Sequence, residues 1–340
     1  GEPPYRGVLS HGWVVDGEGR KMSKSLGNVI APEEIIKQYG ADILRLWVSS
    51  ADFTSDIHLS ADILRQLTEV YRKIRNTCRF LLGNCFDFDP TQQSIRYEAL
   101  AELDRWALCR LDNLVRRVTR AYEEYEFHIV FHALHNFCVV DLSSFYLDIL
   151  KDTLYCEKAD SPARRSAQTV MWLIMETITK LMAPILTFTA DELWQLLPGK
   201  RPASIQVCDW PVPDPQWNDR DLGRRWEILL EVREEVTRAL EQARKEKIIG
   251  GSLEASVSLW AGGDLYPLLK EYHLFLSALF IASNAELFPD MGELPAGAVP
   301  GQKLNLKIQV TRAPGGKCPR CWIFSEREEE LCSRCAAVIR

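Results

Sequence analysis

Cations, hydroxyls and glycines are concentrated in one short segment near the beginning of the chain, residues 17–28. Within five residues it carries Arg20, Lys21 and Lys24, and it adds the hydroxyls of Ser23 and Ser25. Ammonium groups act as point charges on phosphate, hydroxyls add hydrogen bonds, and flanking glycines allow a loop to move. The pattern therefore predicts a loop that binds and releases a polyphosphate, although short Lys/Ser loops also occur as plain solvated basic surface.

The five residues Lys21-Met22-Ser23-Lys24-Ser25 match the KMSKS signature, and their flanks, with His11-Gly12 before and Gly27-Asn28 after, also fit it. In these residues the chain resembles the class I aminoacyl-tRNA synthetases. The resemblance implies that all five bind ATP, used with Mg²⁺, and that an aminoacyl-adenylate forms while pyrophosphate leaves. It also implies catalytic roles for two lysines: Lys24 contacts the phosphates and stabilises the transition state, and Lys21 assists.

The second signature of that family, the HIGH motif, does not occur in this sequence. Most of the Rossmann sheet and the inserted editing domain are also missing from it. We therefore expect that this chain alone does not aminoacylate tRNA, although it supplies part of a ligase that does.

Four cysteines form two CxxC pairs near the end of the chain, at Cys318, Cys321, Cys332 and Cys335. Thiolates at this spacing can surround one tetrahedral Zn²⁺, and a closed Cys₄ shell gives the metal a structural role. Disulfides are the alternative. The other six cysteines are scattered through apolar helical pattern, which is typical of small buried hydrophobes in a reducing compartment such as the cytoplasm.

The tail resembles that of bacterial-type isoleucyl-tRNA synthetases, in which a small α/β module is followed by a Cys₄ element beginning Cys-x-x-Cys-Trp. This resemblance implies that the complete ligase acts on isoleucine, ATP and tRNA(Ile). Trp322 is the tryptophan of that pattern, and Arg320 stands beside it. The indole could stack on an unpaired tRNA base with Arg320 nearby, or it could cover the small core of the knuckle.

Hydrophobic periodicity indicates a mainly α chain. We expect an antiparallel helical bundle of the anticodon-binding type, the tail end of a Rossmann catalytic domain, a small α/β module and a C-terminal Cys₄ zinc knuckle. The expected elements are a buried strand at 8–15, helices from 32, at 60–82, 104–126, 128–150 and 162–183, a helix started by a Thr189/Glu192 capping box, a helix to about 247, strands at 253–259 and 304–310, and a helix at 265–282. The expected domains are 1–30 (end of the catalytic domain), 31–92 (helical connector), 93–215 (anticodon-binding bundle), 216–313 (α/β module) and 314–340 (zinc-binding tail).

The net charge of −6 argues against a generally basic nucleic-acid binder but leaves room for a local basic face. No apolar run is long enough to span a membrane, so we expect no membrane partner. Basic residues do gather on two expected helices and could form a tRNA-backbone surface or ordinary solvated faces: Arg72, Lys73, Arg75, Arg79, Arg116, Arg117 and Arg120. Three other functions stay open: a valyl or other synthetase of the same subgroup, a tRNA-binding module without catalysis, and a zinc-stabilised protein-interaction domain.

Overall fold

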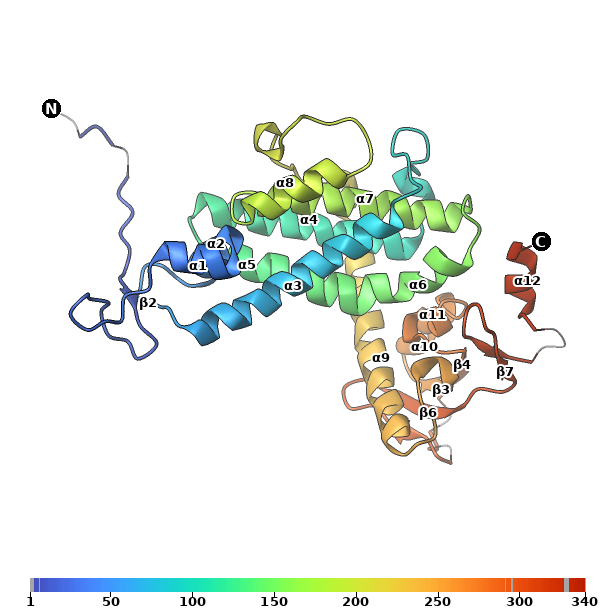
Figure 1. Cartoon of the computed structure of the whole chain (residues 1–340). Coiled ribbons are helices and arrows are strands. Elements are labelled where there is room, and N and C mark those ends of the chain that lie inside the picture. The colour runs from blue at the N-terminus through green and yellow to red at the C-terminus, as the bar shows by residue number, and fades with distance from the viewer. Residues whose placement is uncertain (1–2, 6, 291, 295, 327–329, 340) are drawn as a thin grey trace. The chain divides into compact units, whose positions relative to one another are not determined.

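The computed structural model describes residues 3–5, 7–290, 292–294, 296–326 and 330–339. The chain divides into two compact units (Figure 1). The first, which we call the helical unit, comprises Gly1–Asp148 and Arg165–Asn218. The second, which we call the α/β unit, comprises Ile149–Arg164 and Asp219–Arg340. The chain is mainly helical, as predicted.

The expected strand at 8–15 is wrong for most of its length. Only β1 (Val14–Val15) is a strand, and it pairs in parallel with β2 (Ile57–His58). The side chains of Val8 and Leu9 are 77% and 57% exposed rather than buried. An extended segment becomes a strand only where a neighbour supplies a ladder of hydrogen bonds, and among the described residues β2 offers that ladder to two residues only.

Helices fill most of the helical unit, and those predicted at 60–82, 104–126 and 162–183 are present with both ends within about three residues of the prediction. Ser60 caps the longest, because its Oγ accepts a hydrogen bond of 3.3 Å from the amide of Ile63. The helices of this unit are α1 (Pro32–Tyr39), α2 (Ala41–Ser50), α3 (Ala61–Asn84), α4 (Glu102–Glu123), α5 (Phe127–Asn136), α7 (Pro162–Met182) and α8 (Thr187–Leu196), with short 3₁₀ turns η1 (Tyr97–Ala99), η3 (Ile205–Val207) and η4 (Pro215–Trp217).

The single helix expected at 128–150 is instead three helical segments in succession. A π-helical stretch, η2 (Phe137–Tyr146), separates α5 from α6 (Leu147–Cys156). The hydroxyl of Thr77 on α3 donates a 3.3 Å hydrogen bond to the carbonyl of Cys138, near the start of that stretch. An outside donor at a helix carbonyl accompanies the change from α to π bonding, which periodicity alone does not reveal.

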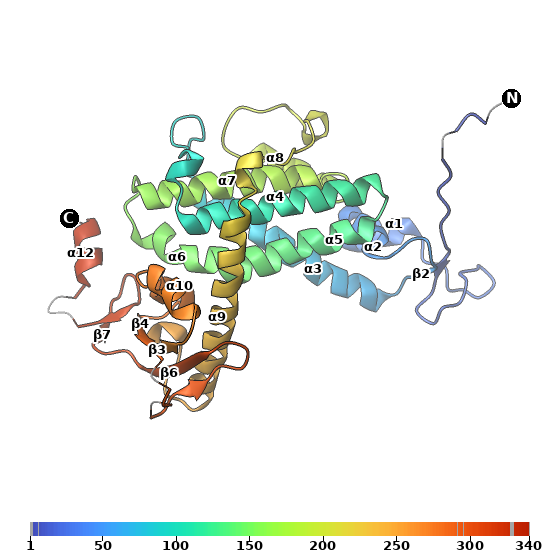
Figure 2. The ribbon, with the colours of Figure 1, turned by 180° about the vertical axis from the view of Figure 1, so that it is seen from behind.

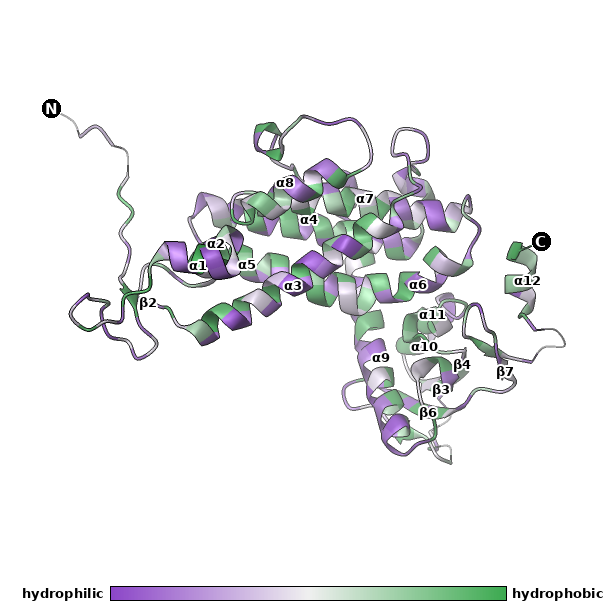
Figure 3. Ribbon diagram, viewed as in Figure 1, coloured by the Kyte–Doolittle hydropathy of each residue, from purple (hydrophilic) through white to green (hydrophobic). Residues whose placement is uncertain are grey.

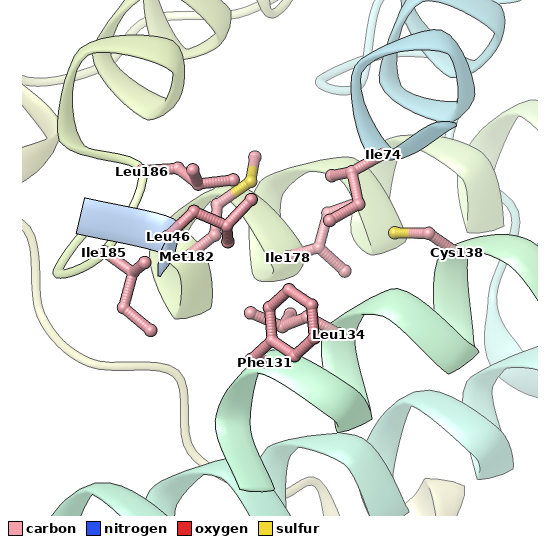
Figure 4. A pocket seen from close by; sticks show the side chains of 9 residues that line it. All are labelled: Leu46, Ile74, Phe131, Leu134, Cys138, Ile178, Met182, Ile185 and Leu186. Carbon is pink, nitrogen blue, oxygen red and sulfur yellow. The ribbon is translucent and has the colours of Figure 1, made fainter. Parts of the chain in front are cut away.

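The core of the helical unit lies where α3, α4, α5 and α7 run side by side (Figures 1 and 2). Hydrophobic and hydrophilic residues alternate along α3, as expected for a helix with one buried face (Figure 3). Nine apolar side chains converge on a void of about 10 Å³ (Figure 4): Leu46, Ile74, Phe131, Leu134, Cys138, Ile178, Met182, Ile185 and Leu186. A void this small, with an apolar lining, is part of a packed core and not a ligand site.

The N-terminus of α8 is capped by a residue from α2. Asp42 is buried, and its carboxylate accepts hydrogen bonds from the amides of Phe188 and Thr189 and from the hydroxyl of Thr189. The predicted Thr189/Glu192 capping box is therefore wrong, since Glu192 instead pairs with Arg75 of α3 at 2.7 Å. A carboxylate from another helix has taken the place of the local cap.

The α/β unit is a four-stranded sheet in the order β4-β3-β6-β5, with α9 (Arg220–Lys245) against β6 (Figure 2). Strands β3 (Ala255–Ala261) and β6 (Leu306–Arg312) are antiparallel and lie close to the predicted strands. Two strands were not predicted: β4 (Asn284–Pro289), parallel to β3, and β5 (Val299–Pro300). The 3₁₀ turn η5 (Ser252–Glu254) precedes the sheet.

The helix expected at 265–282 is broken into α10 (Leu265–Glu271) and α11 (Leu276–Phe280). At the break His273 Nδ1 lies 2.9 Å from the carbonyl oxygen of Lys270, which an uninterrupted helix would bond to its own backbone. Ile281, with φ of 54°, ends α11 in the left-handed region. The chain then turns into β4, so the interruption makes room for the unpredicted strand.

The tail consists of β7 (Gly316–Lys317), β8 (Phe324–Ser325) and α12 (Ser333–Ile339). β7 and β8 pair antiparallel, and the segment that connects them contains the first CxxC pair, Cys318 and Cys321. Among the described helices, none is long and apolar enough to cross a bilayer.

We predict that Asp42→Ala lowers the free energy of unfolding by about 1–3 kcal/mol, because it leaves buried donors at the start of α8 without an acceptor. Urea unfolding followed by far-UV circular dichroism measures the change. Asp62→Ala, which removes an exposed carboxylate from the first turn of α3, is the matched control and is expected to stay within about 0.5 kcal/mol. Equal effects of the two substitutions would contradict the role of Asp42.

Candidate phosphate-binding loop and metal centre

The loop at 16–28 connects β1 to the segment that leads into α1, and its first lysine is held in place. Lys21 forms an isolated antiparallel bridge with Val15 of β1. Its ammonium lies 4.2 Å from the centroid of the Trp13 ring. That ring is 62% exposed, so the cation rests on an aromatic face at the surface, where such a contact contributes about 0.5–1 kcal/mol.

The second lysine lies in a tight turn. The amide of Gly27 donates a 3.3 Å hydrogen bond to the carbonyl of Lys24, and Gly27 has a φ of 68° that favours glycine. The hydroxyls of Ser23 and Ser25 are 3.1 Å apart. Lys24 and Ser25 are exposed, and Lys24 makes no ion pair with another described residue. The turn therefore presents an uncompensated ammonium and a hydroxyl to solvent, which suits an anionic ligand.

The structure brings the four cysteines of the tail together. One sulfur from each of Cys318, Cys321, Cys332 and Cys335 lies within 4.8 Å of the others, and all four residues are buried. Cys321 Sγ and Cys332 Sγ are 3.7 Å apart. All ten cysteines have free thiols. This cluster could hold a metal ion, and no other group of three or more ligating residues is found in the part of the chain that the structure describes.

Backbone amides around the first CxxC turn favour the thiolate form of Cys318. Burial acts to raise the pKa of the Cys318 thiol, but the backbone amides of Cys321, Cys332 and Arg320 outweigh burial and lower that pKa to about 6. The amide of Trp322 also closes the turn with a 2.8 Å hydrogen bond to the carbonyl of Cys318. A thiolate is the form that binds metal, so these amides favour Cys318 as a ligand. Burial has the opposite effect on the second cysteine of the turn and raises the pKa of Cys321 to about 12.

Two arginines connect the cysteine cluster to the last turns of α6. Arg320 Nη1 donates to the backbone carbonyl of Cys156 at 2.6 Å and to Cys335 Sγ at 3.6 Å. Arg334 forms a two-pronged ion pair with Asp152, one contact of which is 2.6 Å. Cationic donors beside thiolates offset their negative charge.

Cys156 itself packs against the four cysteines. The sequence interpretation missed the contribution of Cys156, Asp152 and Arg334. Their distance along the chain hides it, because Cys156 precedes the first CxxC pair by more than 160 residues and carries no spacing signal of its own.

Trp322 projects from the cluster into solvent. Its backbone has a φ of 66°, a left-handed conformation that a bulky residue adopts at a cost, and its side chain is 57% exposed. The ammonium of Lys317 lies 5.0 Å from the ring centroid. The indole is therefore largely exposed, with a cation near its ring.

The basic residues of α3 and α4 divide into two groups. Four of the seven pair with acidic neighbours: Arg72 with Glu69, Arg75 with Glu192, Arg116 with Asp112 and Arg120 with Glu124. Lys73, Arg79 and Arg117 are exposed and make no ion pair with another described residue. These three remain the cations of the two helices best suited to a phosphate backbone.

The sequence of the chain matches known protein families and known proteins. Residues 1–60 match the model for tRNA synthetases class I (I, L, M and V), and residues 104–259 match the anticodon-binding domain of tRNA ligase. The chain is 51% identical over 346 residues to the isoleucine–tRNA ligase of Desulforudis audaxviator and 50% identical over 349 residues to that of Moorella thermoacetica. The chain belongs to the isoleucine–tRNA ligases. The resemblance inferred from the KMSKS segment and the cysteine tail is confirmed.

All of the chain aligns with these relatives, but it spans only 37–38% of their length and corresponds to their C-terminal part. The isoleucine–tRNA ligase of Geobacter sulfurreducens gives the same result, at 50% identity, all of this chain and 37% of the relative. Among solved structures, a LeuRS of Agrobacterium radiobacter in a ternary complex with tRNA aligns with a TM-score of 0.47 and 17% identity, over 75% of this chain and 26% of that one.

We predict that Arg320→Met weakens metal retention by the cysteine cluster about 10- to 100-fold, because substitutions of the groups that contact metal ligands typically have effects of this size. Competition with a chromophoric chelator measures the loss. Arg312→Met, at an exposed arginine at the end of β6, is the matched control and is expected to retain metal like the unaltered protein. Identical retention in both variants would mean that Arg320 does not support the ligands.

Proposed function

We propose that this chain is the tRNA-binding and phosphate-handling part of an isoleucine–tRNA ligase. The complete ligase would activate isoleucine with ATP and transfer it to tRNA(Ile). The observation that carries the proposal is the exposed turn bearing Lys24 and Ser25, in a chain whose relatives at about half identity are named isoleucine–tRNA ligases. Function follows from the site here, because a helical bundle by itself supports many activities.

In the first step an oxygen of the isoleucine carboxylate forms a bond to the α-phosphorus of ATP. The bond from that phosphorus to the bridging oxygen of the β-phosphate breaks, and pyrophosphate leaves with the electron pair. Negative charge develops on the leaving phosphates, so fixed cations lower the barrier. Lys24 would contact those phosphates and Lys21 would assist, while Met22, Ser23 and Ser25 complete the ATP-binding turn. Mg²⁺ would accompany ATP and neutralise further charge.

In the second step a ribose hydroxyl at the end of tRNA(Ile) attacks the carbonyl carbon of the adenylate, and AMP leaves. The described part of this chain would contribute by holding the tRNA. We infer a division into the five domains predicted from the sequence, with the anticodon-binding bundle at 93–215. The family match at 104–259 supports that placement and extends past it into the α/β unit.

We further propose that the cysteine cluster holds one structural Zn²⁺. Four thiolates 2.3 Å from a tetrahedral zinc are separated from one another by about 3.8 Å, and the separation of 3.7 Å between Cys321 and Cys332 supports that fit. Bound zinc would cross-link the two CxxC pairs and so stabilise the fold of the short tail. Free thiols throughout the chain support a reducing compartment, the cytoplasm.

Zinc analysis by atomic absorption tests this assignment. We expect one zinc per chain in the unaltered protein and none in Cys335→Ser. Cys208→Ser, which changes a cysteine outside the cluster, is expected to keep one zinc. Iron in place of zinc, or four oxidised thiols and no metal, would contradict the assignment.

The tail would also contact tRNA. The exposed face of Trp322, with Lys317 beside it, supports stacking on an unpaired base, which is worth about 1–3 kcal/mol. Arg320 has its guanidinium directed at Cys156 and Cys335, and its predicted contact with RNA stays a prediction. Alanine at position 322 keeps the β-carbon and therefore the same backbone strain, so Trp322→Ala removes the indole alone.

The test of the function is binding of the chain to isoleucine, valine and methionine tRNAs at one salt concentration, since affinity for RNA depends steeply on salt. We expect tightest binding to isoleucine tRNA, and a loss of roughly 5- to 150-fold for Trp322→Ala, as 1–3 kcal/mol of stacking implies. Leu274→Ala, at an exposed apolar residue of the α/β unit, is the control. Preference for valine tRNA would favour the valyl alternative. Binding to none of the three would favour a protein-interaction domain.

A further inference from the structure

The phosphate-binding loop is closed at its base by the side chain of Asp16, which is only 11% exposed. Its Oδ1 accepts hydrogen bonds from the amides of Glu18 and Arg20, at 3.0 and 2.9 Å. Its Oδ2 accepts from Arg20 Nε at 2.8 Å and from Asn28 Nδ2 at 3.0 Å. One carboxylate thus joins the first residues of the loop to its last residue, 12 positions away.

Asn28 extends this connection into the middle of the loop. Its Oδ1 accepts a 2.9 Å hydrogen bond from the amide of Ser23, and its Nδ2 also lies 3.5 Å from the carbonyl of Lys21. We call Asp16 and Asn28 the clasp. The clasp grips the backbone on both sides of Met22, which is the centre of the Lys21–Ser25 motif.

The clasp holds only the first half of the motif. Lys21 and Ser23 are bonded to it, whereas Lys24 and Ser25 have only the local bonds of their own turn. The hydrogen bond from Asn28, followed by the backbone bond from Arg20, also lowers the pKa of Asp16 well below its usual range. The carboxylate therefore stays ionised and keeps accepting all four bonds across the working range of pH.

We propose that Asp16 and Asn28 are positioning residues for adenylate formation, which hold Lys21 and the Ser23 amide in register so that the turn bearing Lys24 meets the phosphates. This inference rests on the function proposed above. Loop closure alone does not require the bond between Asn28 and Ser23, because the bond from Asn28 Nδ2 to Asp16 Oδ2 already joins the two ends of the loop. The hydrogen bond from the Ser23 amide to Asn28 Oδ1 instead fixes the backbone of the Lys21–Ser25 motif.

Isoleucine-dependent exchange of pyrophosphate into ATP by the complete ligase tests the proposal, because it reports adenylate formation without tRNA. For Asn28→Ala we expect kcat to fall about 10- to 100-fold, as misplacement of a catalytic group by about 1 Å does. The KM for isoleucine is expected to stay unchanged, because the clasp holds only the lysine loop. The unfolding temperature is also expected to stay unchanged, which separates positioning from a loss of folding.

Exchanging the two side chains gives a sharper test. Asn28→Asp places a second carboxylate against Asp16 and is expected to lower kcat at least as much as Asn28→Ala, through repulsion of like charges. Asp16→Asn combined with Asn28→Asp restores one acid and one amide. The kcat of this double variant is expected to be roughly tenfold higher than that of Asn28→Asp alone, since the amides of Glu18, Arg20 and Ser23 again find acceptors. Asn113→Ala, at an exposed asparagine of α4, is the control.

Lys24→Ala separates failure of this proposal from failure of the proposed function. If Lys24→Ala abolishes exchange while Asn28→Ala and Asn28→Asp leave kcat unchanged, the ligase function stands and the clasp is overturned. If the swapped pair is no better than Asn28→Asp alone, the pairing of the two side chains is overturned as well. If the unaltered ligase shows no isoleucine-dependent exchange, the function fails and the clasp fails with it.

Discussion

The buried carboxylate of Asp42 is the constraint on which the helical unit depends. It lies on α2, which follows the phosphate loop and α1, and it caps α8, almost 150 residues further along the chain. Arg45, one turn later on α2, donates to the carbonyls of Pro184 and Ile185 just before α8. The anionic Asp42 thus accepts from backbone amides at the start of α8, and the cationic Arg45 donates to backbone carbonyls in the turn before it. These two side chains therefore tie α2 to α8 and to the turn before it.

The two candidate sites use charge in opposite ways. At the loop, Lys24 is exposed and has no anionic partner among the described residues, so its charge is available to a ligand. At the tail, four sulfurs are buried together, and the arginines nearest to them are already committed, Arg320 to the cluster and Arg334 to Asp152. A site for a transient anion needs a free cation, whereas a structural metal site needs its negative charge compensated from within. A cationic side chain is therefore available to a ligand at the loop, whereas at the tail the cationic side chains are already paired within the protein.

Features encoded within a few residues were predictable, and features that depend on distant partners were not. The CxxC pairs and the ends of α3 and α4 are local patterns, and the structure agrees with them. The KMSKS segment is also a local pattern, and the family that it indicated is the one that the comparisons show. Thr189 carries the signature of a cap, yet Asp42 performs the capping, which no local window contains. The strand expected at 8–15 failed because pairing requires a neighbour, and β4 was missed because a break at His273 interrupts an otherwise helical pattern. The ties from the tail to α6 likewise join residues far apart in the sequence.

A loop that is fixed in its first half and free in its second suits a site that must bind a polyphosphate and then release it. If both lysines were fixed in positions that suit bound ATP, ATP and the transition state would be held about equally well, and uniform binding does not accelerate a chemical step. A loop with neither lysine fixed would lose the entropy of ordering both at every turnover. In this structure the bonds of Asn28 and the ring of Trp13 order Lys21 in advance, while Lys24 sits in a turn with weak local bonds. Only Lys24, the residue that should meet the developing charge, would thus still have to become ordered at the transition state.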